Sequence, residues 1–105
     1  MTFTGNEGSI ITLAEGSIMT AEYRATISTG DTIGLAVGKN LLASILDQKG
    51  CMGVRMYYAL DDNGKNQLVL VGVDSNGDDM TNGVIVDRLL ACPVVCSIKN
   101  ELNSK

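Results

Sequence analysis

The chain has 105 residues, 45% of them hydrophobic, and a formal net charge of −4 at pH 7. This length and composition favour a single globular domain over residues 1–105 and exclude a wholly disordered chain. The acidic balance without a basic stripe predicts no nucleic-acid partner, and no apolar run approaches the roughly 20 residues of a membrane span. Histidine is absent, which excludes histidine-based catalysis and metal ligation, so we expect no catalytic residue, no cofactor and no metal site.

The N-terminal segment predicts neither a secretory signal nor regular structure. Residues 1–10 are polar and contain glycines, which is typical of an irregular arm, and they lack the basic start and apolar core of a signal peptide. A cytoplasmic location follows as the default. Thr12 then begins a capping box with Glu15, which predicts a helix that continues to about Thr26.

A second helix is predicted at about residues 37–48. Apolar residues recur there at helical spacing, and Gly50 stands just past the end, where a C-cap glycine is expected. The apolar stripe consists of Val37, Leu41, Leu42, Ile45 and Leu46.

Two strands are predicted at residues 52–59 and 67–74, which are rich in Val, Tyr, Leu and Met. Between them, Asn63 and Gly64 are typical of a two-residue type I′ turn, in which both central residues have positive φ. The segment at 67–74 is apolar on both sides, so we expect it to be the middle strand of a sheet.

The type I′ turn would also determine which side chains share a face. It places Tyr57 opposite Leu70 and Tyr58 opposite Val69. Because side chains alternate along a strand, Leu68 then lies on the same face as Tyr57 and Leu70.

A third strand is predicted near residues 80–87, after a second turn at Asn76, with Val84 opposite Val69. The residues from 97 to 105 form a polar tail. Together these elements predict an α+β fold of two layers, in which two N-terminal helices pack on a three-stranded antiparallel meander.

Cysteine chemistry is the next candidate for function. The chain contains Cys51, Cys92 and Cys96, and an odd count without a signal peptide favours reduced thiols. Three residues separate Cys92 from Cys96, one more than in a redox C-x-x-C motif, so a disulfide requires the loop to bend back. A zinc site would need a further ligand beyond the three cysteines. Thiol redox chemistry or metal binding through Cys92 and Cys96 is therefore an alternative function.

An acidic turn follows the middle strand. Asp74, Asn76 and Asp78 have the spacing that begins a calcium loop, but the sixth and twelfth positions are Asp79 and Ile85 instead of Gly and Glu. We therefore expect a solvated turn.

Arg55 lies on the first predicted strand, beside Gly53 and across from Gly72. We expect it to pair with Asp74 at the end of the sheet. Glycines next to an arginine also leave room for a ligand or a partner backbone, so Arg55 and Asp74 are a third candidate site, for a small ligand.

Three segments of the sequence resemble a family of small bacterial proteins with no known activity. They are Gly50–Tyr58 (GCMGVRMYY), Gln67–Asp74 (QLVLVGVD) and Cys92–Ser97 (CPVVCS). The resemblance covers most of the chain, from the first helix to Ser97. It implies a soluble bacterial protein and no catalytic residue, cofactor or substrate.

The leading functional prediction is a non-catalytic interaction module. If two helices cover one face of the sheet, the other face presents Tyr57, Leu68 and Leu70 to solvent. Uncovered apolar patches of this kind often mark interfaces. We therefore predict a homo-oligomer, or a complex with another protein, formed through this face.

Overall fold

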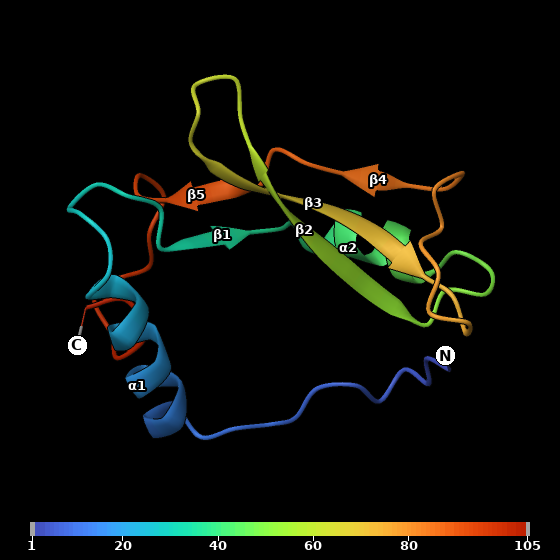
Figure 1. Cartoon of the computed structure of the whole chain (residues 1–105), viewed down its shortest axis with the longest axis horizontal. Helices are drawn as coiled ribbons and strands as arrows, with labels where there is room; N and C mark the ends of the chain where they lie inside the picture. Colours follow the sequence, from blue (N-terminus) through green and yellow to red (C-terminus); the bar gives the residue numbers. More distant parts are fainter. Residues whose placement is uncertain (1, 105) are drawn as a thin grey trace.

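The computed structural model describes residues 2–104. The elements in chain order are α1 (Leu13–Arg24), β1 (Gly34–Ala36), α2 (Lys39–Leu46), β2 (Gly53–Leu60), β3 (Asn66–Val73), β4 (Ile85–Val86) and β5 (Leu90–Cys92). Three strands form an antiparallel sheet in the order β2-β3-β4, and β1 pairs with β5 in a second antiparallel sheet (Figure 1). Within this described part of the chain, neither helix is long and apolar enough to cross a membrane.

Helix α1 begins as its sequence predicts but packs on the C-terminal segment. Thr12 Oγ1 accepts a hydrogen bond from Glu15 N–H at 3.1 Å, and Thr12 N–H donates to the Glu15 carboxylate at 3.3 Å, which confirms the capping box. At the other end, the Arg24 guanidinium donates to Leu102 O at 2.6 Å. Gly16 is buried and faces the Leu102 side chain. Figure 1 shows α1 beside the C-terminus and apart from the three-stranded sheet.

The predicted fold of two N-terminal helices on one meander is therefore wrong. The apolar residues that recur at helical spacing in α1 and at its C-cap are mainly alanines (Ala14, Ala21 and Ala25, with Ile18), which bury little apolar area. The larger side chains of α1 stay in solvent, and Ile18 and Met19 are 63% and 64% exposed. The helix that packs against the three-stranded sheet is α2, which contacts β2 and β3.

The small sheet of β1 and β5 was not predicted. Leu35 lies opposite Ala91, and Ile33 N–H extends the ladder by donating to Cys92 O at 2.8 Å. Each strand has three residues, which is too short for an alternating pattern to be recognised. Because β1 lies between α1 and α2 in the chain and pairs with β5, the two helices are separated and do not form one layer.

The core lies between α2 and the three-stranded sheet. Its buried cluster consists of Ile45 from α2, Leu70 from β3, Val86 from β4, and Leu89. Ile45 and Leu70 are both fully buried. The prediction that the second strand of the hairpin is the middle strand is confirmed, because β3 has a neighbour on each side and its last four residues are buried.

The hairpin register is displaced by one residue from the prediction. Tyr58 lies opposite Leu68 and not opposite Val69, and Tyr57 lies opposite Val69 and not opposite Leu70. Opposed residues share a face, so the displacement moves every side chain of β3 to the other face relative to β2.

The cause of the displacement is a longer turn than expected. Gly64 has a φ of 74°, but the only non-glycine residue with positive φ between residues 2 and 104 is Arg88, so Asn63 does not have the type I′ conformation. Instead, Gly64 N–H donates to Asp61 O at 3.0 Å and Asp61 N–H donates to Lys65 O at 2.8 Å. The Asp61 carboxylate also accepts hydrogen bonds from the backbone of Asn63 and Lys65, both at 2.9 Å. The connection is thus a three-residue loop closed by a glycine bulge.

The third strand, β4, is shorter than predicted and pairs in another register. Val86 lies opposite Leu70, and the predicted pair of Val84 with Val69 does not form. Val84 N–H donates instead to the Gln48 side-chain oxygen at 2.7 Å. The end of α2 therefore holds this segment, and the strand begins only after it.

Candidate functional site

The three residues of the predicted interface do not share a surface. Leu70 is fully buried and Leu68 is half-buried, and both pack with the core under α2. Tyr57 lies on the opposite face of the sheet and is 48% exposed. The displaced register is the reason, because it turns Leu68 and Leu70 to the face that carries Tyr58 and Met56.

The chain nevertheless exposes much more surface than a compact monomer. Its accessible surface is 7704 Å², whereas a compact monomer of 11.1 kDa has about 5,700 Å². The radius of gyration is 15.3 Å, against about 13 Å for a compact domain of this length. The open arrangement of α1, the N-terminal arm and the sheets leaves about 2,000 Å² of additional surface in contact with solvent.

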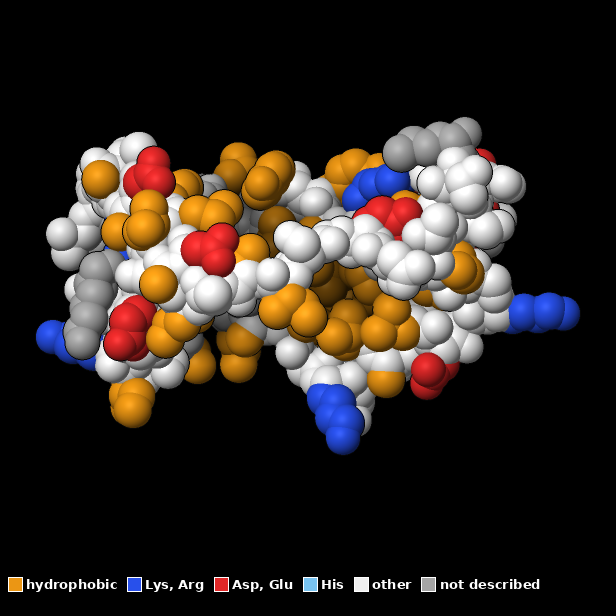
Figure 2. All heavy atoms as spheres, turned by 90° about the horizontal axis from the view of Figure 1, so that it is seen from below, with side chains coloured by type: hydrophobic (Ala, Val, Ile, Leu, Met, Phe, Trp, Pro, Cys, Tyr) orange, Lys and Arg blue, Asp and Glu red, His pale blue; other side chains and the backbone are white. Residues whose placement is uncertain are grey.

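Much of this surface is apolar. Ile10, Tyr58 and Val94 are each more than 90% exposed, although they belong to different parts of the chain. Figure 2 shows hydrophobic side chains gathered around a hollow on one face of the molecule. Large contiguous apolar surfaces of this kind are rare on monomers and typically mark contacts with another macromolecule.

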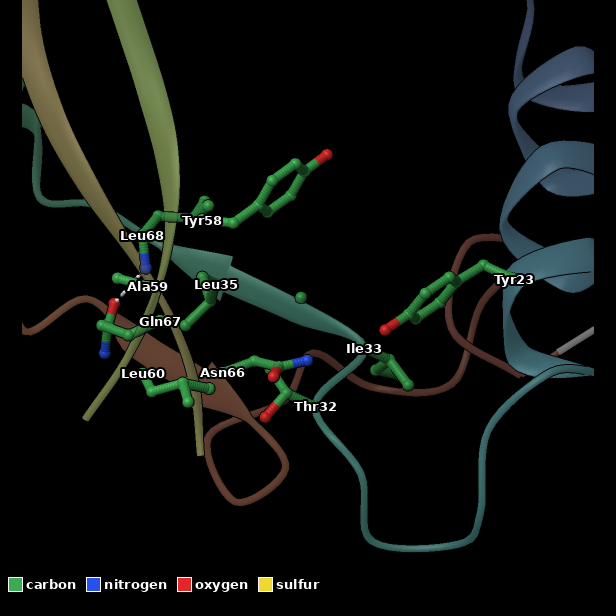
Figure 3. Close-up of a pocket in the computed structure, with 11 residues that line it drawn as sticks. Tyr23, Thr32, Ile33, Leu35, Tyr58, Ala59, Leu60, Asn66, Gln67 and Leu68 are labelled. Atoms are coloured by element: carbon green, nitrogen blue, oxygen red, sulfur yellow. Dashed lines mark hydrogen bonds between the residues drawn. The ribbon is translucent and has the colours of Figure 1, made fainter. Parts of the chain in front are cut away.

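An apolar groove lies between the small sheet, the hairpin and α1. It has a volume of about 520 Å³, and its apolar lining includes Tyr23, Ile33, Leu35, Tyr58, Leu60 and Leu68. Figure 3 shows Tyr23 of α1 and Tyr58 of β2 reaching into the opening from opposite sides. The sequence did not predict this groove, because the small sheet of β1 and β5 was not expected and α1 was expected to pack directly on the meander.

On the other face of the sheet, Arg55 forms an ion pair with Asp79 and not with Asp74. The Arg55 Nη1 to Asp79 Oδ1 distance is 2.6 Å, and the same nitrogen donates to Gly77 O at 3.1 Å. The Tyr57 hydroxyl donates to the other Asp79 oxygen. Asp79 faces this pair because it lies across from Val73, the last residue of β3.

These contacts change the acidity of all three groups. The hydrogen bond from Tyr57 and the ion pair with Arg55 lower the pKa of Asp79 below its ordinary value. The same hydrogen bond raises the pKa of Tyr57, and the carboxylate of Asp79 raises the pKa of Arg55. Arg55 and Tyr57 thus both donate hydrogen bonds to the Asp79 carboxylate, and these contacts hold the 77–79 turn against β2.

Asp74 stabilises the acidic turn. Its Oδ1 accepts hydrogen bonds from Asn76 N–H at 2.9 Å and from Asp78 N–H at 3.0 Å. Gly77 N–H donates to Asp74 O at 3.0 Å, and Asp74 N–H donates to Asp78 O at 3.0 Å. The turn repeats the geometry of the Asp61 loop, so the calcium-like spacing serves a backbone turn. Over residues 2–104, no group of three potential metal ligands from Cys, Asp and Glu lies close enough to hold a metal ion.

Cys92 and Cys96 are joined by a disulfide, with their Cα atoms 4.8 Å apart. The three-residue segment between them bends back, as a bond between these residues requires, and Val95 N–H donates to Ala91 O at 3.0 Å. This pair therefore differs from the reduced thiols expected from the cysteine count. Cys51 is free and half-buried, and its Sγ donates to Gly53 O at 3.2 Å.

Comparisons with known proteins give this chain no relative. No family model matches it, and no curated protein or solved structure is similar to it. Its function must therefore be inferred from the surface chemistry and geometry described above.

Proposed function

We propose that the protein is a non-catalytic interaction module that self-associates. The observation that carries this proposal is the additional accessible surface of about 2,000 Å² per chain relative to a compact monomer. Obligate homodimers bury about 2,000–5,000 Å² in total, or about half of that on each subunit. The surface left exposed by one chain thus matches what one subunit of such an assembly buries.

The chemistry of the exposed surface supports the same proposal. Obligate interfaces are more apolar than ordinary protein surface, and side chains such as Tyr58, Ile98 and Leu60 are here largely exposed. The core of the isolated chain is small by comparison, since six hydrophobic residues are buried within residues 2–104. Association with a second copy would add apolar burial that a single chain lacks.

The interface we propose differs from the face predicted from sequence. Leu68 and Leu70 already pack against the core of the chain, so they are not the residues that would contact a second copy. The exposed residues of the hairpin, Met56, Tyr58 and Leu60, take their place.

Sedimentation equilibrium and light scattering after size exclusion test this function. We expect a mass of at least twice 11.1 kDa, with dissociation only at high dilution. A particle of monomer mass at every concentration would refute self-association. If the protein binds a different protein and not a second copy of itself, the purified chain would also have monomer mass, and this outcome would also count against self-association.

A second candidate function is thiol–disulfide exchange at Cys92 and Cys96. The observation that favours it is the closed disulfide, in which Cys96 is exposed to solvent. Reduction would take two electrons and two protons from a dithiol reductant and leave two thiols in place of the sulfur–sulfur bond.

Equilibration with glutathione buffers, followed by alkylation and mass spectrometry, tests the redox function. An exchange role requires that two alkylated thiols appear together within the range of cellular thiol potentials. A disulfide that stays closed across that range refutes the role. Metal analysis of the reduced protein, in which Cys92 and Cys96 are free thiols beside the already free Cys51, tests the metal-binding version of this candidate.

A further inference from the structure

The outer edge of β2 has no neighbouring strand. In the sheet order β2-β3-β4, β2 pairs with β3 on one side, and no strand within residues 2–104 pairs with its other side. Figure 1 shows it at the margin of the sheet away from β4. Exposed edges of this kind are templates for pairing with another chain.

The hydrogen-bond pattern shows which backbone groups the edge presents. Asp61 N–H donates to Lys65 O across the hairpin, and inward and outward residues alternate along an antiparallel ladder. The residues whose N–H and C=O groups point away from β3 are therefore the even-numbered ones. They are Val54, Met56, Tyr58 and Leu60.

This edge also lacks the features that normally prevent pairing. Protected edges are short, or carry prolines, lysines or bulges, whereas β2 runs for eight residues as GVRMYYAL. Its one charged residue, Arg55, is held by Asp79 across the sheet. Met56, Tyr58 and Leu60 are 56%, 96% and 69% exposed, so neither α1 nor the N-terminal arm covers this half of the strand.

The N-terminal arm marks where the free edge begins. Phe3 N–H donates to Ser75 O at 2.8 Å, and the Phe3 ring lies against Gly53. Gly5 lies so close to Met52 that a Cβ on Gly5 would be 3.3 Å from the Met52 carbonyl oxygen. Pairing with another strand can therefore start only after Met52, which leaves the segment from residue 54 to residue 60 available.

We infer that a second copy of this chain pairs with that edge, β2 against β2 in antiparallel orientation across a two-fold axis. This inference rests on the proposed self-association and names its interface. The two sheets then form one continuous sheet of six strands, in the order β4-β3-β2-β2-β3-β4. Two-fold pairing of identical edges is self-complementary, as closed dimers require.

The register of this pairing follows from the outward-facing groups. Only outward-facing residues can form hydrogen-bonded pairs, and centring the axis on Tyr57 brings all four of them into such pairs. Met56 then pairs with the partner's Tyr58, and Val54 with the partner's Leu60. An axis at Met56 or Tyr58 would leave one outward-facing residue of each chain unpaired.

The side chains are complementary in the register centred on Tyr57. On the face toward α2, the Met56 thioether lies beside the partner's Tyr58 ring, a favourable sulfur–aromatic contact. On the opposite face, Tyr57 lies beside the partner's Tyr57. Arg55 lies opposite the partner's Ala59, so the two Arg55 side chains stay about 13 Å apart along the strand.

The first experiment changes the edge without changing the hairpin. Met56→Pro removes an N–H that points away from β3, so it costs no hydrogen bond within the chain, but it blocks the pair with the partner's Tyr58. Met56→Ala is the matched control, because it removes the same side chain and keeps the N–H. We expect the dimer dissociation constant of Met56→Pro to exceed that of Met56→Ala by about 100-fold, since both symmetric copies of the pair are lost. Circular dichroism of both variants checks that the monomer stays folded.

The second experiment tests the register by cross-linking in a Cys51→Ala background. Tyr57→Cys places two thiols in a pair without hydrogen bonds, where Cα atoms are about 4.5 Å apart, within the range of a disulfide. Ala59→Cys on the same face is the control, because the two introduced thiols would be about 13 Å apart. We expect mild oxidation to cross-link Tyr57→Cys and not Ala59→Cys.

The outcomes separate this inference from the proposed function. A monomeric wild-type protein refutes both. An oligomeric wild-type protein that is unaffected by Met56→Pro, or that cross-links equally well through Ala59→Cys, refutes pairing at β2 and leaves self-association through another surface standing. Loss of the dimer in Met56→Pro alone, together with cross-linking through Tyr57→Cys alone, supports the pairing and its register.

Discussion

The contact between Gly83 and Gln48 makes a quantitative prediction about how the third strand is held. A Cβ on Gly83 would lie 2.0 Å from Gln48 Oε1 and 3.1 Å from Gln48 Cδ. Gly83→Ala must therefore displace the Gln48 side chain, which also breaks the 2.7 Å hydrogen bond from Val84 N–H. Crowding of this kind costs about 1–3 kcal/mol, and a part-buried donor left without a partner costs about 1–3 kcal/mol more. We expect Gly83→Ala to lower the free energy of unfolding by about 2–6 kcal/mol.

A double-mutant cycle tests the cause of that loss. Gln48→Ala removes the acceptor for Val84 and should cost about 1–3 kcal/mol by itself. The combined variant should cost no more than Gln48→Ala alone, because the group that collides with the new methyl is gone. Urea unfolding followed by circular dichroism measures all three variants, at one protein concentration because the stability of an oligomer depends on concentration. Gly34→Ala is the control, since nothing lies within 4 Å of a Cβ at that position. Additive losses in the cycle would refute the reasoning.

Four further predictions concern the core, the charged cluster and the first helix. Leu70→Ala should cost about 2–5 kcal/mol in urea unfolding, because Leu70 is fully buried; a loss below 1 kcal/mol would contradict its place in the core. The lowered pKa of Asp79 means that its stabilisation is complete above the ordinary pKa of an aspartate and is lost as the pH falls through the lowered value, so Asp79→Asn should remove this part of the acid-side decline in stability. The raised pKa of Tyr57 has the opposite sign: its stabilisation is complete below the ordinary pKa of a tyrosine and is lost as the pH rises through the raised value, and Tyr57→Phe should be insensitive to that rise. Thr12→Ala should weaken α1 by about 1 kcal/mol, seen as faster amide exchange in α1 with the exchange of β3 unchanged.

The free edge of β2 would also explain a feature that is unusual for a monomer. The strand is apolar on both faces at its second half, and Met56, Tyr58 and Leu60 remain largely in solvent. Pairing with a second copy places these residues beside partner side chains and satisfies the outward-facing backbone groups in the same step. The groove under Tyr58 and Leu60 would then continue toward the partner subunit.

Sequence reasoning succeeded where a few neighbouring residues determine the outcome. The capping box of Thr12 and Glu15 forms as expected, because its two hydrogen bonds join residues within one helical turn. It was less successful at the hairpin. Asn63 and Gly64 do mark the turn, but the carboxylate of Asp61 stabilises a longer loop, and the register changed with the loop length.

The one-residue error in the hairpin register changed the predicted site more than it changed the predicted strands. The grouping of Tyr57 with Leu68 and Leu70 depended on a register that was wrong by one residue, and such an error exchanges the two faces of a strand. Arg55 has an acidic partner as expected, but the extra residue in the acidic turn makes that partner Asp79. The largely apolar character of β2 and its edge position in the predicted meander were both visible in the sequence, but the prediction placed the interface on a face of the sheet and not on this edge.

The sequence by itself determined the start of α1, the positions of both Asp-x-Asn-Gly turns and the middle place of β3, because each depends on local hydrogen bonds or on one apolar run. Only the tertiary structure decided that β1 pairs with β5, that α1 packs on the C-terminal segment, and which face of the hairpin α2 covers. These depend on contacts between residues far apart in the chain, whose strength is set by the apolar area they bury together and not by the preference of any one segment.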